Sequence, residues 1–377
     1  MRVCLVYDCL YPYTVGGAER WYRNVGEHLA ARGHEVTFLT RRQWDRDEVQ
    51  VPGVRVLAVS PRMDLYDARG RRRFLPPLLF GLGVLRHLLR HGRRYDVVHT
   101  ASFPYFSLLA AGAARKRGRY TLLVDWHEIW TRAYWQDYVG RLAGWIGWQV
   151  QQRCVRVPQR AFCFSRLHER RLRDLGLQGP LTRLEGQYTG RAARVPEPAR
   201  PVVVFAGRHI PEKRIPALVS ALTRVPDVGA EIYGDGPERE RVLAAIRRDG
   251  LAERVAVAGF VDADVLEQAL ATSLCFVLPS QREGYGLVVI ESAAHGVPSV
   301  VVDGPDNAAT ELVEDGTNGV IAASASAEDL ANAITRVREA GTVLREATLD
   351  WFHRNAERLS LESSLQVVAA EYASADS

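Results

Sequence analysis

Short runs of β-branched and other apolar residues alternate with helical patterns along nearly the whole chain. This alternation predicts an α/β fold with parallel sheets, because strands that are joined through helices pair in parallel. Residues 3–7 predict a first strand, and Trp21, Val25 and Leu29 lie four apart on one face of the helix that follows. Residues 36–39 then complete a βαβ unit. Further strands of this first sheet are predicted at residues 97–100, 121–124 and 161–164.

The composition changes near residue 186. Residues 186–201 are rich in Gly, Arg, Ala and Pro and show no periodicity, which indicates an interdomain linker. A second series of predicted strands follows, at residues 202–205, 231–233, 255–258, 275–278 and 299–302.

A chain of 377 residues is longer than one ordinary domain. We therefore expect two Rossmann-like domains, residues 1–186 and residues 187–350. Residues 351–377 contain an amphipathic helix, over 351–372, that is long enough to cross back to the first domain.

Composition excludes several classes of protein. A hydrophobic fraction of 47% with 25% charged residues is typical of a globular protein, not of a disordered, collagenous or coiled-coil chain. The net charge is only +5, with acids interleaved among 47 arginines and two lysines, so we expect no nucleic-acid partner. The five cysteines form no C-x-x-C pair, which favours a reducing, cytoplasmic location. No apolar stretch approaches the roughly 20 residues that span a bilayer.

Two cations follow the first strand of the second domain. Arg208 and Lys213 lie five residues apart on the loop that leaves residues 202–205. At the carboxyl edge of a parallel sheet they are well placed to bind a diphosphate, and the lysine offers a compact point charge. A solvated loop is the alternative interpretation.

A glycine-rich turn follows the next strand. Residues 231–238 predict a strand, a turn with Gly234 and Gly236, and a helix start at which Pro237 is well suited. The glycines would allow the backbone to approach a ligand closely, and a plain tight turn explains them equally well.

The strongest signal lies in residues 279–291. A loop follows the strand at 275–278, and a helix is predicted to start near Gly286, where its free amides make an anion site. Glu283 lies in the loop and Glu291 lies within the helix. A carboxylate would be repelled by phosphate, so we expect both to accept hydrogen bonds from sugar or ribose hydroxyls of one elongated ligand.

The spacing of Glu283 and Glu291 is the E-x7-E motif, and the chain resembles the retaining glycosyltransferases of the GT-B fold, specifically glycosyltransferase family 4. The resemblance covers nearly the whole chain, and its motifs occur in the family's order. They are the glycine loop at 16–19, the cations at 207–213, the turn at 234–237, residues 259–261 and the late loop at 311–319.

The resemblance implies a role for each of these residues in the donor site. Arg208 and Lys213 would neutralise the leaving nucleoside diphosphate, Glu291 would bind the ribose, and Glu283 would hold hydroxyls of the donor sugar. His127 would lie over that sugar, with Asp125 and Glu128 orienting its ring. The remaining donor-binding residues implied are Gly16, Gly17, Gly234, Gly259, Phe260, Val261, Gly284, Tyr285, Gly286 and Leu287. One departure is residues 185–188, where the family often has an Asn-Gly turn, and it concerns the interdomain hinge and not the donor site.

The implied reaction moves a sugar from a nucleoside-diphosphate-sugar to an acceptor hydroxyl with retention, by a front-face mechanism. We expect no cofactor and no metal: Asp262 and Asp264 match a D-x-D string, but acids are favoured at a helix start by capping and by the helix dipole.

The acceptor is a natural product or aminocyclitol, a lipid carrier or a growing glycan. The alternatives are a GT-B epimerase or phosphorylase and a non-catalytic nucleotide-sugar-binding protein. A Rossmann dehydrogenase is disfavoured, since no G-x-G-x-x-G follows the first strand.

Two further features leave alternatives open. The aromatic run between Trp126 and Trp148 is either a stacking surface for an acceptor or, as is usual for large aromatics, mostly core. Residues 69–94 mix arginines with leucines, and are either an amphipathic helix on a membrane surface or a helix packed on the first sheet with a solvated basic face. We favour the packed helix, so peripheral membrane contact is the less favoured alternative.

Overall fold

The structure, a computed structural model, describes residues 1–45, 50–65 and 73–373. The chain forms two compact units: unit 1 comprises Met1–Glu185 with Glu362–Ser377, and unit 2 comprises Gly186–Leu361. Each unit is built on its own parallel sheet. The α/β prediction with two Rossmann-like domains is thereby confirmed.

The sheet of unit 1 has seven strands in the order β3-β2-β1-β4-β5-β6-β7. Every pair is parallel, with Val6 of β1 opposite Leu39 of β2 on one side and Thr100 of β4 on the other. The strands are β1 (Arg2–Val6), β2 (Glu35–Arg41), β3 (Val54–Ser60), β4 (Val97–Ala101), β5 (Thr121–Trp126), β6 (Arg160–Cys163) and β7 (Leu181–Arg183).

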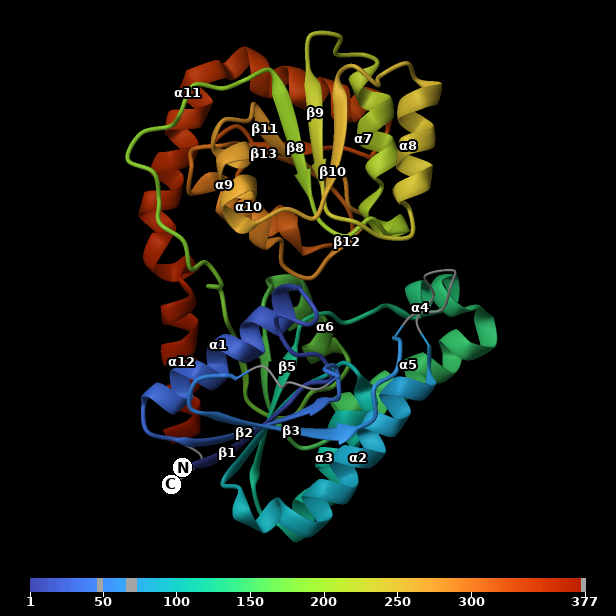
Figure 1. The fold of residues 1–377 in the computed structure, drawn as a ribbon, viewed down its shortest axis with the longest axis vertical. Coiled ribbons are helices and arrows are strands. Elements are labelled where there is room, and N and C mark those ends of the chain that lie inside the picture. Colours follow the sequence, from blue (N-terminus) through green and yellow to red (C-terminus); the bar gives the residue numbers. More distant parts are fainter. Residues whose placement is uncertain (46–49, 66–72, 374–377) are drawn as a thin grey trace. The chain divides into compact units, whose positions relative to one another are not determined.

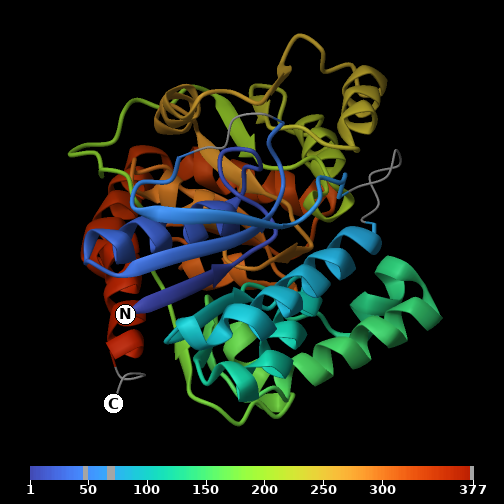
Figure 2. The same ribbon diagram turned by 60° about the horizontal axis from the view of Figure 1, so that its bottom comes forward.

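Helices cover both faces of this sheet. In Figure 1, α1 and α12 lie on one face, and α2, α3 and α5 lie on the other. Figure 2 shows α2, α3 and α5 as one layer from below. The helices of unit 1 are α1 (Gly17–Ala31), α2 (Leu75–His91), α3 (Tyr105–Gly118), α4 (Arg132–Val139), α5 (Arg141–Val155), α6 (Arg166–Asp174) and α12 (Leu361–Ala373), with a 3-10 turn η1 (Gly92–Arg94).

The sheet of unit 2 has six parallel strands in the order β10-β9-β8-β11-β13-β15. They are β8 (Val202–Ala206), β9 (Gly229–Tyr233), β10 (Val255–Gly259), β11 (Cys275–Leu278), β13 (Ser299–Val302) and β15 (Gly319–Ala322). A separate two-stranded ladder joins β12 (Arg282–Glu283) to β14 (Asp306–Asn307). This small ladder forms at the loop that the sequence marked as the strongest signal.

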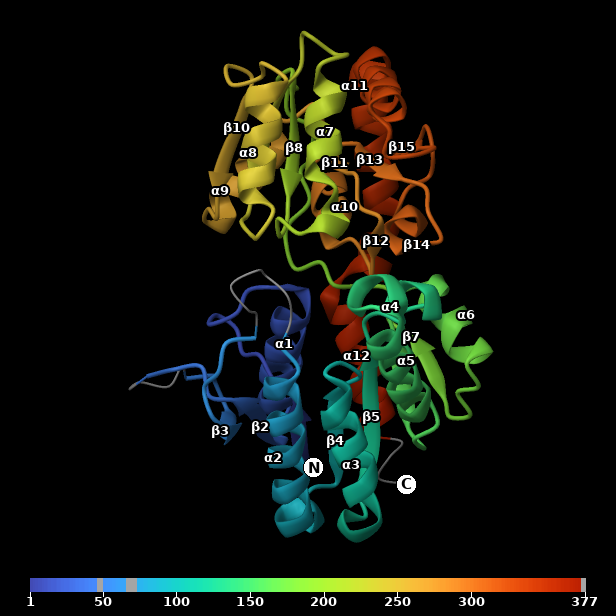
Figure 3. The same cartoon turned by 90° about the vertical axis from the view of Figure 1, so that its right-hand side faces the viewer.

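The helices of unit 2 also lie on both faces of their sheet. Figure 3 shows α7 and α8 together beside the strands, and Figure 1 shows α9 and α10 on the opposite side. They are α7 (Ile215–Leu222), α8 (Arg239–Arg248), α9 (Ala263–Ala271), α10 (Leu287–Ala293) and α11 (Ala327–Leu359), with 3-10 turns η2 (Pro211–Lys213) and η3 (Ala308–Leu312).

The C-terminal segment is divided between the two units. Helix α11 ends at Leu359, and Ser360 takes an extended conformation before α12 begins. Trp351 and Phe352 pack in the core of unit 2, whereas residues from Glu362 onward belong to unit 1. The single helix expected over 351–372 is thus two helices.

Helix α12 is fixed to unit 1 by one buried and one half-buried polar contact. The Tyr372 hydroxyl lies 2.8 Å from Nδ1 of His99 on β4, and Arg160 pairs with Glu371 at 2.8 Å. Across the part of the chain that is described, no helix combines the length and apolarity needed to cross a bilayer.

Candidate active site

The loop after β8 continues the sheet beyond the end of the strand. The backbone N–H groups of Gly207 and His209 donate to the carbonyl oxygens of Tyr233 and Asp235, at 3.1 and 2.8 Å. The loop then closes into η2, where the Lys213 N–H donates to the Ile210 carbonyl at 3.0 Å. Arg208 is exposed and Lys213 is half-buried, so this loop presents both predicted cations from a hydrogen-bonded frame.

Gly234 and Gly236 are required by the packing of two loops. A Cβ on Gly234 would lie 2.0 Å from the Gly207 oxygen, and one on Gly236 would lie 2.4 Å from the His209 oxygen. Both residues also have positive φ angles, 104° and 157°, which a side chain disfavours. Contact with the neighbouring backbone therefore accounts for these glycines.

The loop after β11 is held from two sides. The Gln281 N–H donates to the Glu212 carbonyl at 2.8 Å, which links this loop to η2. The Asn307 side chain, 2% exposed, donates to the carbonyl oxygens of Val302 at 2.8 Å and Ser280 at 3.3 Å. Sequence reasoning missed Asn307, because a lone asparagine after a strand carries no pattern. It fixes the backbone from which Glu283 projects.

Glu283 and Lys213 form an ion pair between Oε1 and Nζ. Glu283 is only 8% exposed, and the ammonium group compensates a carboxylate that burial would otherwise disfavour. The sequence predicted separate roles for these residues, on sugar hydroxyls and on diphosphate. The structure brings the two side chains into direct contact, so the two predicted roles fall on one ion pair.

Helix α10 begins at Leu287, after Gly286 adopts a φ of 105°. A Cβ on Gly286 would lie 2.8 Å from the Cβ of Ala309, so glycine is needed for both the turn and the contact with η3. Glu291 is half-buried on this helix. Burial, followed by the charges of Glu267 and Glu291, raises the pKa of Tyr188 to about 12. The Glu291 carboxylate is therefore near enough to act on the Tyr188 hydroxyl.

The loop after β10 lies against the glycine turn. The Gly234 N–H donates to the Gly259 carbonyl at 2.7 Å. Phe260 is 71% exposed, whereas Val261 packs against the core of unit 2. Sequence reasoning missed Arg239, whose Nη2 donates to the Val257 carbonyl at 3.4 Å and whose Nη1 is buried without a hydrogen-bond partner. Four loops of the carboxyl edge therefore share one hydrogen-bonded framework.

His209, between the two cations, is also a residue that sequence reasoning missed. It is fully buried, and neither ring nitrogen has a hydrogen-bond partner. Burial lowers its pKa, although the charge of Asp235 opposes that shift. The neutral imidazole acts as packing beneath the loop, with its ring 6.2 Å from that of Phe205.

In unit 1, His127 follows β5 as predicted and is positioned by aromatic rings. It stacks on Phe164 with centroids 4.7 Å apart, and its Nε2 has no hydrogen-bond partner. Burial lowers its pKa against the opposing charges of Asp125 and Glu128. The ring is therefore held neutral at physiological pH.

The two carboxylates expected to orient His127 have other partners. Asp125 binds Nε2 of His99 at 2.9 Å and accepts from Nε1 of Trp21 at 2.7 Å. Glu128 accepts from Nε1 of Trp130 at 2.9 Å. Stacking on Phe164, rather than a carboxylate, thus orients the His127 ring.

The glycine loop of unit 1 leads into α1. Gly16 is the N-cap residue in extended conformation, and a Cβ there would lie 2.4 Å from Oε2 of Glu19, which folds back over it. A Cβ on Gly17 would meet nothing within 4 Å. The contact with Glu19 therefore explains why residue 16 is glycine. The backbone of Gly17 has free space beside it.

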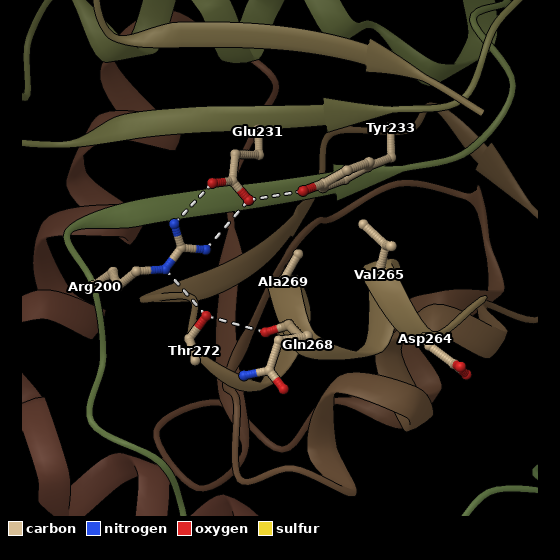
Figure 4. A pocket seen from close by; sticks show the side chains of 8 residues that line it. All are labelled: Arg200, Glu231, Tyr233, Asp264, Val265, Gln268, Ala269 and Thr272. Atoms are coloured by element: carbon tan, nitrogen blue, oxygen red, sulfur yellow. Dashed lines mark hydrogen bonds and ion pairs between the residues drawn. The ribbon is translucent and has the colours of Figure 1, made fainter. Parts of the chain in front are cut away.

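A pocket in unit 2 lies apart from these residues. It opens between β9 and α9 (Figure 4), and none of the predicted site residues lines it. Its polar groups bind one another: Glu231 accepts from Arg200 at 2.8 Å and from the Tyr233 hydroxyl at 2.9 Å, and Arg200 donates to Thr272 at 3.1 Å. We therefore assign it no part in the site.

Asp264 also lines this pocket, in the first turn of α9. Asp262 occupies the N-cap position, but its side chain makes no capping hydrogen bond, so the helix dipole remains the reason for these acids. Among the described residues, no three His, Cys, Asp or Glu side chains gather in a way that could hold a metal ion.

Comparisons with known proteins agree with this architecture. The family described as "Glycosyl transferase 4-like domain" matches residues 16–185, and "Glycosyl transferases group 1" matches residues 200–339. The lipopolysaccharide core biosynthesis glycosyltransferase LpsE of Rhizobium meliloti is 28% identical over 334 residues, 85% of each chain.

Two solved structures share the fold over nearly the whole chain. Sucrose-phosphate synthase from Thermosynechococcus elongatus has a TM-score of 0.84 at 20% identity, covering 99% of this chain and 98% of that one. Anabaena Alr3699/HepE in complex with UDP-glucose has a TM-score of 0.73 at 19% identity, covering 99% and 100%.

The family models, the relatives and the fold together define a sugar-transferring enzyme of the GT-B class. The protein is a glycosyltransferase, and the 4-like family model matches within unit 1 and the group 1 model within unit 2.

Proposed function

We propose that this glycosyltransferase is a retaining, metal-independent enzyme of family 4 that transfers a sugar from a nucleoside diphosphate to an acceptor hydroxyl. The donor-binding loops are those at the carboxyl edge of the unit 2 sheet. A solved structure of the same fold was obtained in complex with UDP-glucose, which supports a nucleotide-sugar donor of this kind.

One observation carries the proposal: the buried Glu283 carboxylate meets the Lys213 ammonium at this edge. A diphosphate that approaches Lys213 brings its own negative charge, so the ammonium can turn to the phosphate oxygens. Glu283 then needs new donors, and the hydroxyls of the sugar attached to that diphosphate supply them. The pair is suited to a ligand that carries both groups.

The proposed reaction is a substitution on one face of the sugar. The bond from the anomeric carbon to the phosphate oxygen breaks as the acceptor oxygen bonds to the same face, which retains the configuration. The acceptor proton passes to the departing phosphate oxygen. Lys213 and Arg208 stabilise the charge that develops on the diphosphate, and the remaining residues hold donor and acceptor in place.

His127 and the glycines of unit 1 complete the proposal. His127 would contact the donor sugar through a neutral imidazole, and Gly17 would offer open backbone to the diphosphate. Arg208, Gly259, Phe260, Val261 and the 284–287 segment keep their proposed donor-binding roles, with Glu291 on the ribose.

The acceptor class is proposed from relatives. LpsE is named for lipopolysaccharide core biosynthesis, and this favours a cell-envelope glycan or lipid, with a small natural product or aminocyclitol as the second candidate. An epimerase or a non-catalytic nucleotide-sugar-binding protein is not favoured.

The test is an assay of nucleotide release from a panel of nucleoside-diphosphate sugars, with and without each acceptor class, in excess EDTA. We expect release that depends on the acceptor, and a product whose anomeric configuration by NMR equals that of the donor. An inverted product contradicts retention. Loss of activity in EDTA that magnesium or manganese restores contradicts metal independence.

A further inference from the structure

One face of unit 1 is basic to an unusual degree. Helices α2, α3, α4 and α5 carry one acidic residue, Asp137, although the whole chain has 44 acids against 49 bases. On the opposite face of the sheet, α1 and α12 carry two arginines and four glutamates. The eight basic residues of the four helices are Arg86, Arg90, Arg115, Lys116, Arg117, Arg132, Arg141 and Arg153.

The same helices expose most of the large apolar side chains at the surface. Nine of the fourteen exposed large hydrophobic residues recorded in the described ranges lie on α2, α4 and α5 or directly before α2. They are Phe74, Leu75, Leu78, Leu82, Leu89, Tyr138, Leu142, Trp145 and Ile146, exposed by 39% to 74%.

Helix α2 shows how both properties arise in one element. Phe80, Val84 and Leu88 pack into the core of unit 1, as the packed-helix interpretation of this stretch requires. The outward stripe, however, carries Leu78 and Leu82 as well as arginines. Residues 69–72 of the stretch lie outside the described residues.

These helices form one continuous layer. Helix α3 packs against both α2 and α5, and α4 packs against α5. Figures 1 and 3 show the N-terminal end of α2 and the α4–α5 pair toward the same end of this layer. The segments 74–82 and 138–146, which carry these apolar residues, therefore lie toward one end of the layer, and the segments with the arginines of α2 and α3 lie farther along it.

We propose that this helical layer docks unit 1 onto the surface of a membrane that contains anionic lipids. Leucine, phenylalanine and tryptophan side chains bury apolar area at the boundary between head groups and acyl chains, and arginines bind lipid phosphates. Within the described ranges, no carboxylate pairs with Arg86, Arg90 or Arg141. A protein partner would have to supply all the compensating acids, whereas an anionic bilayer presents them everywhere.

The proposal is independent of which acceptor the enzyme uses. The test is cosedimentation of the full chain with vesicles of phosphatidylcholine alone and of phosphatidylcholine mixed with phosphatidylglycerol. We expect binding to the anionic vesicles that weakens as salt is raised. Equal binding to both vesicle types, or none to either, overturns the proposal.

Two double variants locate the surface. Arg86→Gln with Arg90→Gln removes two surface charges and should weaken binding about 30-fold, since each arginine near an anionic surface contributes about 1 kcal/mol. The control Arg247→Gln with Arg354→Gln makes the same change in net charge on exposed positions of unit 2. Equal weakening by the control would show an effect of total charge and overturn the assignment of this face.

The apolar contribution is tested with Leu78→Gln and Leu82→Gln, which should reduce binding at least tenfold without lowering the unfolding temperature, since both side chains are exposed. The control is Val343→Gln on α11, a position 75% exposed. Quenching of Trp145 by brominated lipid, absent in Trp145→Phe, should accompany binding. If the leucine variants instead abolish a dimer and leave vesicle binding intact, the face is a self-association surface and the membrane proposal fails.

Discussion

At the scale of single residues, the contact between Glu283 and Lys213 separates two effects of one substitution. Glu283→Ala removes the proposed partner of the sugar hydroxyls and releases the Lys213 ammonium. We expect turnover to fall roughly a hundredfold or more, while the affinity for nucleoside diphosphate is maintained or rises. Calorimetric titration beside steady-state kinetics measures both, with Glu253→Ala as a control on an exposed glutamate. A large loss of diphosphate affinity with normal turnover would contradict the assignment.

The same pair predicts an effect on stability. Lys213→Ala leaves the Glu283 carboxylate buried without its cation, which we expect to lower the free energy of unfolding by about 1–3 kcal/mol. Lys213→Ala combined with Glu283→Ala should recover part of that loss, because no buried charge remains. Urea unfolding of the two single variants and the double variant measures these free energies. If the losses of the single variants add up to the loss of the double variant, the two groups do not interact.

The pairing itself lay beyond sequence reasoning. Lys213 and Glu283 could each be singled out, from a loop leaving a strand and from a glutamate beside glycines. They are 70 residues apart, however, and they are brought together by the pairing of β8 with β11, by the ladder of β12 with β14 and by the bond from Gln281 to Glu212. Local patterns contain no information on such long-range contacts, which also explains why Asn307 was missed.

At the scale of elements, the loop glycines hold the carboxyl edge together. Gly234→Ala would place a Cβ 2.0 Å from the Gly207 oxygen at a φ of 104°, so we expect a loss of about 3 kcal/mol or more. Gly250→Ala is the matched control, because its φ is 67° and a Cβ there meets nothing within 4 Å. Strain alone should cost it about 1–2 kcal/mol. Equal destabilisation in urea would contradict the packing argument.

The strands of the two sheets that the sequence did not predict lie at the sheet edges. The inner strands were predicted because both of their faces are buried, which favours a run of apolar residues such as that of β11. The strands β3, β7 and β15 were not predicted, and each lies at an edge. Edge strands such as β7, with Thr182 and Arg183, carry polar residues that resemble a loop.

At the scale of the whole molecule, α12 belongs to unit 1 through a buried chain of polar groups. Tyr372 contacts His99, which binds Asp125, which accepts from Trp21. Tyr372→Phe leaves a buried nitrogen of His99 without its partner, and we expect the free energy of unfolding to fall by about 1–2 kcal/mol. Tyr138→Phe, at an exposed position, should change it by less than about 0.5 kcal/mol. Similar effects of the two variants in thermal unfolding would contradict the role of this chain of contacts.

We expect both units to become less stable as the pH falls below about 6.5. Burial is the first cause that lowers the pKa of six histidines, and for His87 on α2 the value falls to about 4. Below about pH 6.5 the unfolded chain binds protons at these groups that the folded chain does not, so stability falls as pH falls. The six are His28, His34, His87, His127, His209 and His295.

This stability is fully present above about pH 6.5 and is lost progressively as the pH falls toward the folded pKa values, which for His87 is about 4. Asp96, Asp125 and Asp315 also have lowered pKa values, and their stabilisation is lost only at lower pH, below about 4. Urea unfolding of the full chain at about pH 7.5 and about pH 5.5 therefore isolates the histidines. We expect lower stability at the acidic value, and His87→Asn should narrow the difference because it removes one of the shifted groups. Equal stability at the two values, or an unchanged difference in His87→Asn, would contradict the assignment.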